Sequence, residues 1–203
     1  HSLALHPDGT VIAWGNNCCG QTNVPAAATN LVDLAAGTNF SAGLRSDGVV
    51  VTWGATVTPP VSNVVAIAAG ADHGLALRLD GTVVGWGSNN YAQITVPITA
   101  TNLVAISAGE RHSLALNASG KVFAWGNNSF GQTNIPASVT NIIAIQAGRY
   151  HNLALRGDGG IIGHGMSLTP AAWGENHSRR SRRPPGRPAG PASAGCCRNS
   201  LAA

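Results

Sequence analysis

A 25-residue segment occurs twice in this chain of 203 residues. Residues 112–136 read HSLALNASGKVFAWGNNSFGQTNIP and residues 1–25 read HSLALHPDGTVIAWGNNCCGQTNVP, with 17 of 25 positions identical. Three further copies begin at Phe40, His73 and His151, so the steps between copies are 39, 33, 39 and 39 residues. Periods in this range are typical of propellers, solenoids and other repeat arrays, and the repeat therefore decides the fold class.

Every copy except the first, which begins at its second run, contains three short apolar runs. In the fourth copy they are NLVAISAG (102–109), HSLALNA (112–118) and KVFAWG (121–126). Runs of this length and composition predict strands. An Ala-Gly pair separates the first two runs, and a pair that suits a tight hairpin separates the last two. The hairpin pairs are Asp8-Gly9, Asp47-Gly48, Asp80-Gly81, Ser119-Gly120 and Asp158-Gly159. Each unit is therefore predicted to be an antiparallel meander of three to four strands, and no window shows a helical period.

Such small sheets cannot bury both faces alone, so neighbouring sheets must cover each other. Tight hairpins favour radial stacking into an all-β propeller over a linear solenoid. The second period is six residues shorter than the others, and the whole loss falls in the connector GATVTPP, which implies fixed elements on either side. The chain begins at the second strand of a unit. We therefore expect the first sheet to lack a strand, with an exposed edge, and the ring to be incomplete.

The fourth copy resembles the repeat of the regulator of chromosome condensation (RCC1-like) family. The resemblance rests on Ala108-Gly109, residues 112–116, Gly120, Val122, Trp125-Gly126, Asn128 and Gly131-Gln132. It covers roughly residues 1–165 and implies a propeller, usually of seven blades. Thr-Asn-Val-Pro or its variants follow Gly-Gln where the best-known eukaryotic members have Leu-Gly. This is more similar to the compact bacterial-type repeat, which includes a propeller that inhibits β-lactamases.

The basic charge of the chain belongs to its last segment. Residues 1–178 contain six Lys/Arg and eight Asp/Glu, whereas residues 179–203 contain six Arg and no acid. Nucleic-acid binding is therefore not expected of the repeats. We divide the chain into repeats at 1–165, comprising four full periods and part of a fifth, and a degenerate remnant with an Arg/Pro-rich tail at 166–203. Two interpretations of the tail stay open: a disordered segment that binds polyanions, or an out-of-frame translation of another repeat.

Four histidines occupy one position of the repeat and suggest a metal cluster, but equivalent positions of a ring lie apart. We expect each ring to lie against its Ala-Gly turn and to hydrogen-bond backbone. These residues are His1, His73, His112 and His151, with Phe40 in the second copy. By the same logic the tryptophans are predicted to be packing anchors between sheets rather than a base-stacking platform: Trp14, Trp53, Trp86 and Trp125.

The connector after Trp-Gly varies most between copies, and such loops commonly carry binding residues. Its amides and aromatics suit a protein interface, although the Asn side chains could instead satisfy their own turns. The candidate protein-binding residues are Asn89, Asn90, Tyr91, Asn127, Asn128 and Phe130.

No catalytic, cofactor or metal site is expected, and the chain is predicted to be a non-catalytic scaffold for a protein partner. Two alternatives remain: an exchange or regulatory factor for a small GTPase, and an inhibitor of a secreted enzyme. The localisation stays open, with an extracellular or cell-surface location favoured. No membrane-spanning segment is visible.

Overall fold

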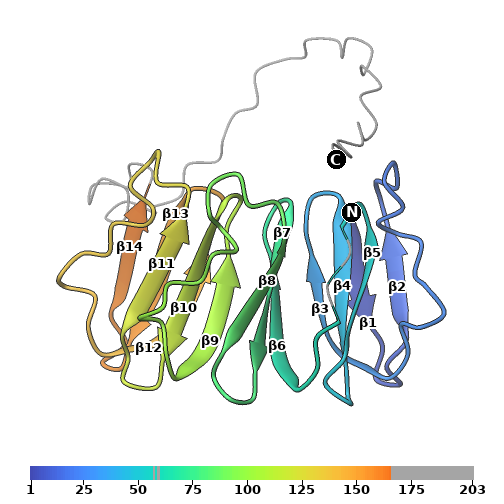
Figure 1. The fold of residues 1–203 in the computed structure, drawn as a ribbon, viewed down its shortest axis with the longest axis horizontal. Helices are drawn as coiled ribbons and strands as arrows, with labels where there is room; N and C mark the ends of the chain where they lie inside the picture. The colour runs from blue at the N-terminus through green and yellow to red at the C-terminus, as the bar shows by residue number, and fades with distance from the viewer. Residues whose placement is uncertain (57, 59, 166–203) are drawn as a thin grey trace, which may run out of the picture.

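The computed structural model describes residues 1–56, 58 and 60–165. The interpretations of residues 166–203 lie outside these residues. Within the described residues there is no helix, and fourteen strands form five antiparallel sheets (Figure 1). The fold is the predicted all-β array of small meanders.

The five sheets follow the five copies of the repeat. Sheet 1 has two strands and the other four have three each, in the order of the chain. Sheet 1 contains β1 (Ser2–Leu5) and β2 (Val11–Trp14), and sheet 2 contains β3 (Leu31–Ala36), β4 (Phe40–Arg45) and β5 (Val50–Gly54). Sheet 3 contains β6 (Val64–Ala69), β7 (His73–Arg78) and β8 (Val83–Gly87). Sheet 4 contains β9 (Leu103–Ala108), β10 (His112–Asn117) and β11 (Val122–Gly126), and sheet 5 contains β12 (Ile142–Ala147), β13 (His151–Arg156) and β14 (Ile161–Gly165).

The hairpin glycines lie where the sequence predicts them. Gly9, Gly48, Gly81, Gly120 and Gly159 have φ between 77° and 86°, a conformation that residues with a Cβ rarely adopt. A second repeated feature precedes the first strand of sheets 2 to 5, where Asn30, Asn63, Asn102 and Asn141 have φ between 52° and 58°. Asn tolerates this left-handed conformation better than most residues. The hairpin glycines therefore precede the last strand of each sheet, and the asparagines precede the first strand of sheets 2 to 5.

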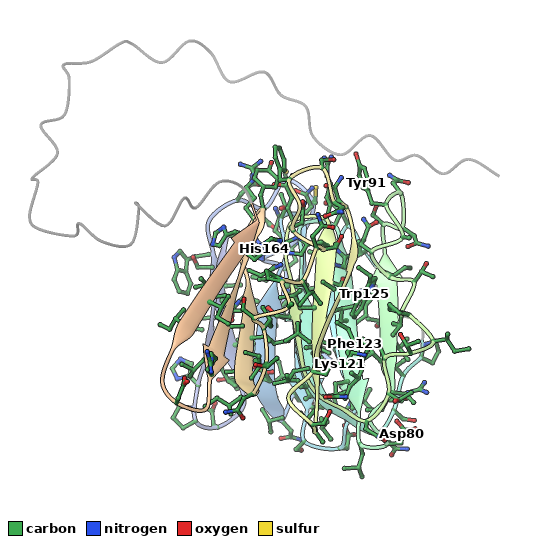
Figure 2. All side chains as sticks on the ribbon, turned by 90° about the vertical axis from the view of Figure 1, so that its left-hand side faces the viewer. Asp80, Tyr91, Lys121, Phe123, Trp125 and His164 are labelled. Carbon is green, nitrogen blue, oxygen red and sulfur yellow. The ribbon has the colours of Figure 1, made fainter. Side chains whose placement is uncertain are left out.

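The meander places two kinds of loop at opposite ends of each sheet. The Ala-Gly turns and the starts of the connectors lie at one end, which we call the connector end, and the Asp-Gly hairpins lie at the hairpin end. Figure 2 shows Tyr91, from a connector, at one end of the array and Asp80, from a hairpin, at the other.

Neighbouring sheets are joined by backbone at both ends. At the connector end the turns form a ladder in which Thr38 N donates to Ala71 O at 2.8 Å and Ala71 N to Glu110 O at 3.1 Å. At the hairpin end Leu103 N donates to Gly81 O of the preceding hairpin at 3.2 Å. The two views together show the sheets following an arc rather than a flat row (Figures 1 and 2).

The core lies between sheets. One cluster joins Leu75 and Leu77 of sheet 3 to Ala115, Phe123 and Trp125 of sheet 4, and the other interfaces repeat this arrangement. Each sheet therefore has a preceding face and a following face, turned toward its lower-numbered and higher-numbered neighbours. In sheets 2 to 4 the tryptophan lies on the preceding face, where it meets the sheet before and the connector that leads out of that sheet.

This geometry confirms three of the four predicted tryptophan anchors and corrects one. Trp53, Trp86 and Trp125 are 6%, 3% and 6% exposed, whereas Trp14 is 53% exposed. The prediction for Trp14 is wrong because the anchor needs a connector and a sheet on its preceding side. No sheet among the described residues covers that side of sheet 1.

Candidate functional site

A relay of polar side chains crosses the interface between sheets 3 and 4. His73 Nε2 lies 3.0 Å from Ser113 Oγ, and the Ser113 hydroxyl donates to the carbonyl oxygen of Gln93 at 2.7 Å. Trp125 Nε1 donates to the same carbonyl at 2.9 Å. Because the single hydroxyl proton of Ser113 is used on Gln93, His73 must donate from Nε2.

The same relay recurs between sheets 1 and 2. His1 Nε2 lies 2.9 Å from Ser41 Oγ, and both Ser41 and Trp53 donate to the Gln21 carbonyl, at 2.7 and 2.9 Å. Between sheets 4 and 5, Asn152 replaces the serine: His112 Nε2 donates to its Oδ1 at 2.7 Å, and its Nδ2 donates to the carbonyl of Gln132. The histidine at this position thus links neighbouring sheets by a hydrogen bond.

The predicted environment of the histidines is right in one respect and wrong in another. A Cβ added at Gly70 or Gly109 would overlap the ring of His73 or His112, so these rings do lie against the Ala-Gly turn. Their Nε2 atoms, however, bond side chains of the next sheet and not backbone. The reason is that the second residue of the middle strand faces the preceding sheet, and in sheets 2, 4 and 5 this residue is polar: Ser41, Ser113 and Asn152.

Burial keeps these histidines neutral. Loss of solvent, with electrostatic coupling to the nearby His112 as a smaller cause, lowers the pKa of His73 to about 4. Burial also lowers the pKa of His112, against the hydrogen bond to Asn152, which raises it. Nδ1 of both rings has no hydrogen-bond partner among the described residues, so nothing there stabilises a second proton.

Most predicted binding amides hold their own connectors. Asn89 accepts from Ile94 N at 3.1 Å, and Asn128 accepts from Thr133 N at 3.0 Å. Asn127 accepts from Ser129 N at 3.0 Å and from Gln132 Nε2 at 3.0 Å. Asn90 is exposed at the tip of its connector. These bonds hold the connectors in one shape and present the aromatic residues that follow.

Tyr91 and Phe130 are those aromatic residues, and each meets the turn of the next sheet. The Arg111 guanidinium lies 5.4 Å from the ring centre of Tyr91 and donates to its hydroxyl at 3.2 Å. The ring of Phe130 lies 4.9 Å from that of Tyr150. Both pairs are 20 residues apart in sequence and occupy equivalent positions of successive repeats.

Glu110 and Arg149 join the two pairs. The Arg149 guanidinium lies 4.9 Å from the Tyr150 ring and forms an ion pair with Glu110, which also lies 3.7 Å from Arg111. The hydrogen bond from Arg149 is the main reason why the pKa of Glu110 falls below its ordinary value. We call this set the connector-end surface; it consists of Tyr91, Glu110, Arg111, Phe130, Arg149 and Tyr150.

The connector-end surface is accessible and borders a depression. Tyr91 and Phe130 are 41% and 45% exposed, and the side chains of Arg111 and Arg149 are 50% and 72% exposed. The depression, of about 570 Å³, is walled by the Ala-Gly turns of sheets 2 to 5. Of the connector-end surface, Glu110, Arg111 and Arg149 line this depression, whose wall otherwise consists mainly of Ala and Gly residues.

Sequence reasoning missed the half of this surface that comes from the turns. The two residues after each Ala-Gly pair differ in every repeat: Thr38-Asn39, Ala71-Asp72, Glu110-Arg111 and Arg149-Tyr150. A meander places these turns at the same end as the connectors, so their variability was a usable signal.

The described residues contain no candidate for two other kinds of site. No group of three or more His, Cys, Asp or Glu side chains in the described part of the chain could hold a metal ion. The described residues also contain no helix with the length and apolarity needed to cross a membrane.

Comparison with known proteins identifies the class and then the repeat. The fold is that of β-propeller proteins. Residues 1–21, 64–93 and 103–132 match the model of the regulator of chromosome condensation (RCC1) repeat, so these three segments of the chain are RCC1 repeats. A search of curated protein sequences gave no significant match.

Solved structures of similar fold include yeast RCC1 (Prp20) in complex with Kap60, with 25% identity and a TM-score of 0.69 over 80% of this chain and 53% of that one. A second structure, of Prp20p from Saccharomyces cerevisiae, has 24% identity and a TM-score of 0.68 over 80% of this chain and 54% of that one. The ectodomain of the receptor kinase CR4 from Physcomitrella patens has 22% identity and a TM-score of 0.68 over 80% of this chain and 49% of that one. The chain therefore spans about half the length of these relatives.

Proposed function

We propose that this chain is a non-catalytic protein-binding scaffold and that its partner docks on the connector-end surface. The observation that carries the proposal is the cross-sheet cluster of Tyr91, Arg111, Phe130, Arg149 and Tyr150. Aromatic rings and guanidinium groups are the side chains that most often dominate the energy of protein interfaces.

The cluster is also preorganised. Stacking of Arg111 on Tyr91 and of Arg149 on Tyr150 restricts long side chains before any partner arrives. Binding then costs less side-chain entropy than it would for free arginines. The guanidinium groups keep further N–H donors for a partner, since each has five.

The relatives support a protein partner in general terms. Prp20p is described with its binding to Gsp1p and histones, and its structure is known with Kap60. A propeller of the same repeat type thus serves as a protein-binding surface there. Exchange-factor activity on a small GTPase is the competing function, and the experiment below separates the two.

The test compares capture by three forms of the full chain. Proteins bound by the wild type are quantified against Tyr91→Ala/Phe130→Ala and against Leu79→Ser, a matched control. Leu79 is an apolar residue at the hairpin end and is 79% exposed. Loss of two interface aromatics should weaken a specific partner by about tenfold or more, whereas Leu79→Ser should change nothing.

Equal capture by the wild type and the aromatic double variant would overturn the proposed surface. If the partner binds guanine nucleotides, release of a fluorescent nucleotide is then measured with and without the chain. Acceleration of that release would replace the scaffold function with exchange activity.

A further inference from the structure

A polar cavity of about 230 Å³ lies at the connector end, between the tip of the connector that follows β8 and the turns of sheets 3 and 4. The tip and the two turns supply the side chains that give the cavity its chemistry. They are Ser88, Asn90 and Tyr91 from the connector, Asp72 from the turn of sheet 3, and Glu110 and Arg111 from the turn of sheet 4. The lining thus holds two carboxylates and one guanidinium group, and its net charge is negative.

Asp72 is the acidic residue of this cavity that has no counter-charge. Glu110 forms an ion pair with Arg149 and lies 3.7 Å from Arg111. The carboxylate of Asp72 is exposed and has neither a hydrogen-bond partner nor an ion-pair partner among the described residues. The amide of Asn90 is likewise exposed and makes no side-chain hydrogen bond there. The cavity therefore offers a carboxylate and an amide oxygen to a ligand that donates hydrogen bonds.

The shortened connector of sheet 2 leaves Asp72 uncovered. The position of Asp72 holds Arg111 in sheet 4 and Tyr150 in sheet 5, and the connector of the preceding sheet contacts each of them through Tyr91 or Phe130. The connector between sheets 2 and 3 spans residues 55–63, whereas the connector between sheets 3 and 4 spans residues 88–102. The shorter one has no residue at the position of Tyr91, so a side chain of a bound partner can take that place.

We propose that the partner bound at the connector-end surface places a lysine or arginine side chain in this cavity, with the cationic group on Asp72. The proposal rests on the proposed function and specifies the chemistry of the partner. A cation donates a charge-assisted hydrogen bond to the carboxylate, and the ring of Tyr91 forms an aromatic wall for the charge and the alkyl stem. An acidic side chain would be repelled by Asp72, and a neutral one would leave its charge unpaired.

The first experiment measures the binding of N-acetyl-argininamide to the full 203-residue chain, with N-acetyl-citrullinamide as the neutral isostere. Nuclear magnetic resonance of the isotope-labelled chain locates the binding through the backbone amide shifts. We expect saturable shifts at Asp72 and Asn90 with the arginine probe. The citrulline probe should bind at least about threefold more weakly, since it has no charge to pair with the carboxylate.

Asp72→Asn removes the charge and keeps the volume of the side chain. This variant should bind the arginine probe about threefold to tenfold more weakly than the wild type does. Asp80→Asn is the matched control, because it removes the same charge at the opposite end of the array (Figure 2) and should bind like the wild type. Circular dichroism verifies that both variants are folded.

Three results would overturn the proposal: no saturable binding of the arginine probe, equal binding of the two probes, or equal binding by the wild type and Asp72→Asn. The capture assay described above, with Asp72→Asn as a fourth form, separates this failure from that of the proposed function. Capture that is lost in Tyr91→Ala/Phe130→Ala and retained in Asp72→Asn keeps the docking surface and rejects the basic side chain. Capture that neither variant changes rejects the docking surface itself.

Discussion

The interface between sheets 2 and 3 and the interface between sheets 3 and 4 use the same positions with opposite chemistry. Between sheets 3 and 4, His73, Ser113 and Trp125 converge on the carbonyl of Gln93. Between sheets 2 and 3, the equivalent positions hold Phe40 and Gly74, and Trp86 packs edge-on against Phe40 at 6.5 Å and 78°. The polar relay is replaced by an aromatic pair.

The replacement indicates that the members of the relay are present together or absent together. Phe40 removes the histidine, Gly74 removes the serine, and the shortened connector contains no glutamine at the position of Gln93. Buried polar groups are favourable only when every member has a partner, so partial loss of the relay would cost more than complete loss. One polar group of the relay remains between sheets 2 and 3, because Trp86 Nε1 is buried and has no hydrogen-bond partner among the described residues.

The packing of Trp86 against Phe40 depends on the absence of a side chain at position 74. A Cβ added at Gly74 would overlap the indole ring of Trp86. Ser113, at the same position of the next repeat, instead leaves room for Trp125 to reach the Gln93 carbonyl.

The largest effect should come from removing an anchor inside the array. Trp125→Ala should lower the free energy of unfolding by about 3–5 kcal/mol, because it leaves a cavity and removes one of the two hydrogen bonds to the Gln93 carbonyl. The matched variant Trp14→Ala should cost less than about 1 kcal/mol, because Trp14 is half exposed and bonds nothing comparable. Urea denaturation followed by circular dichroism measures both, and similar costs would contradict the assignment of Trp125 as an anchor.

Acid should weaken the polar interface and spare the aromatic one. The folded pKa of His73 is about 4, below the unfolded value near 6.5, so the unfolded chain binds more protons between these values. The stability that His73 contributes is complete above pH 6.5 and is lost as the pH falls to 4, about 3 kcal/mol in all. Denaturation from pH 7 to pH 4 measures this loss.

His73→Phe is the control for that titration, since Phe40 shows that the position accepts a phenyl ring. The variant should lose less stability with acid than the wild type does. An unchanged pH dependence would mean that other groups cause the acid effect.

A smaller effect is expected from removing the middle member of the relay. Ser113→Ala should cost about 1–3 kcal/mol, because His73 Nε2 loses its acceptor while staying buried. Combining it with His73→Phe should recover part of that cost, since the buried donor is then absent. Additive losses in this double-mutant cycle would show that His73 and Ser113 are not coupled.

The repeat predicted the fold because hairpin chemistry is local. Asp80-Gly81 and its counterparts, and the alternation of short apolar runs, fixed the meander from neighbours in sequence. The error at Trp14 arose because anchoring depends on a neighbouring sheet and not on the residue's own repeat. The connector prediction named Tyr91 and Phe130 but not the residues that contact them, Arg111 and Tyr150, which lie 20 residues further along the chain.

The relay could not be predicted for the same reason. His73, Ser113 and Gln93 are separated by 40 and 20 residues, and only the stacking of sheets brings them together. The sequence did show both Phe40 and the shortened connector, as two unrelated departures from the repeat. Only the contact between sheets 2 and 3 shows that these two departures belong to one interface.

The most direct test of the two interface chemistries compares Trp125→Phe with Trp86→Phe. Both variants remove the same volume and the same indole N–H, but among the described residues only the N–H of Trp125 has an acceptor. We expect Trp125→Phe to lower the free energy of unfolding by at least about 1 kcal/mol more than Trp86→Phe does. Equal costs, or a greater cost for Trp86→Phe, would contradict the account.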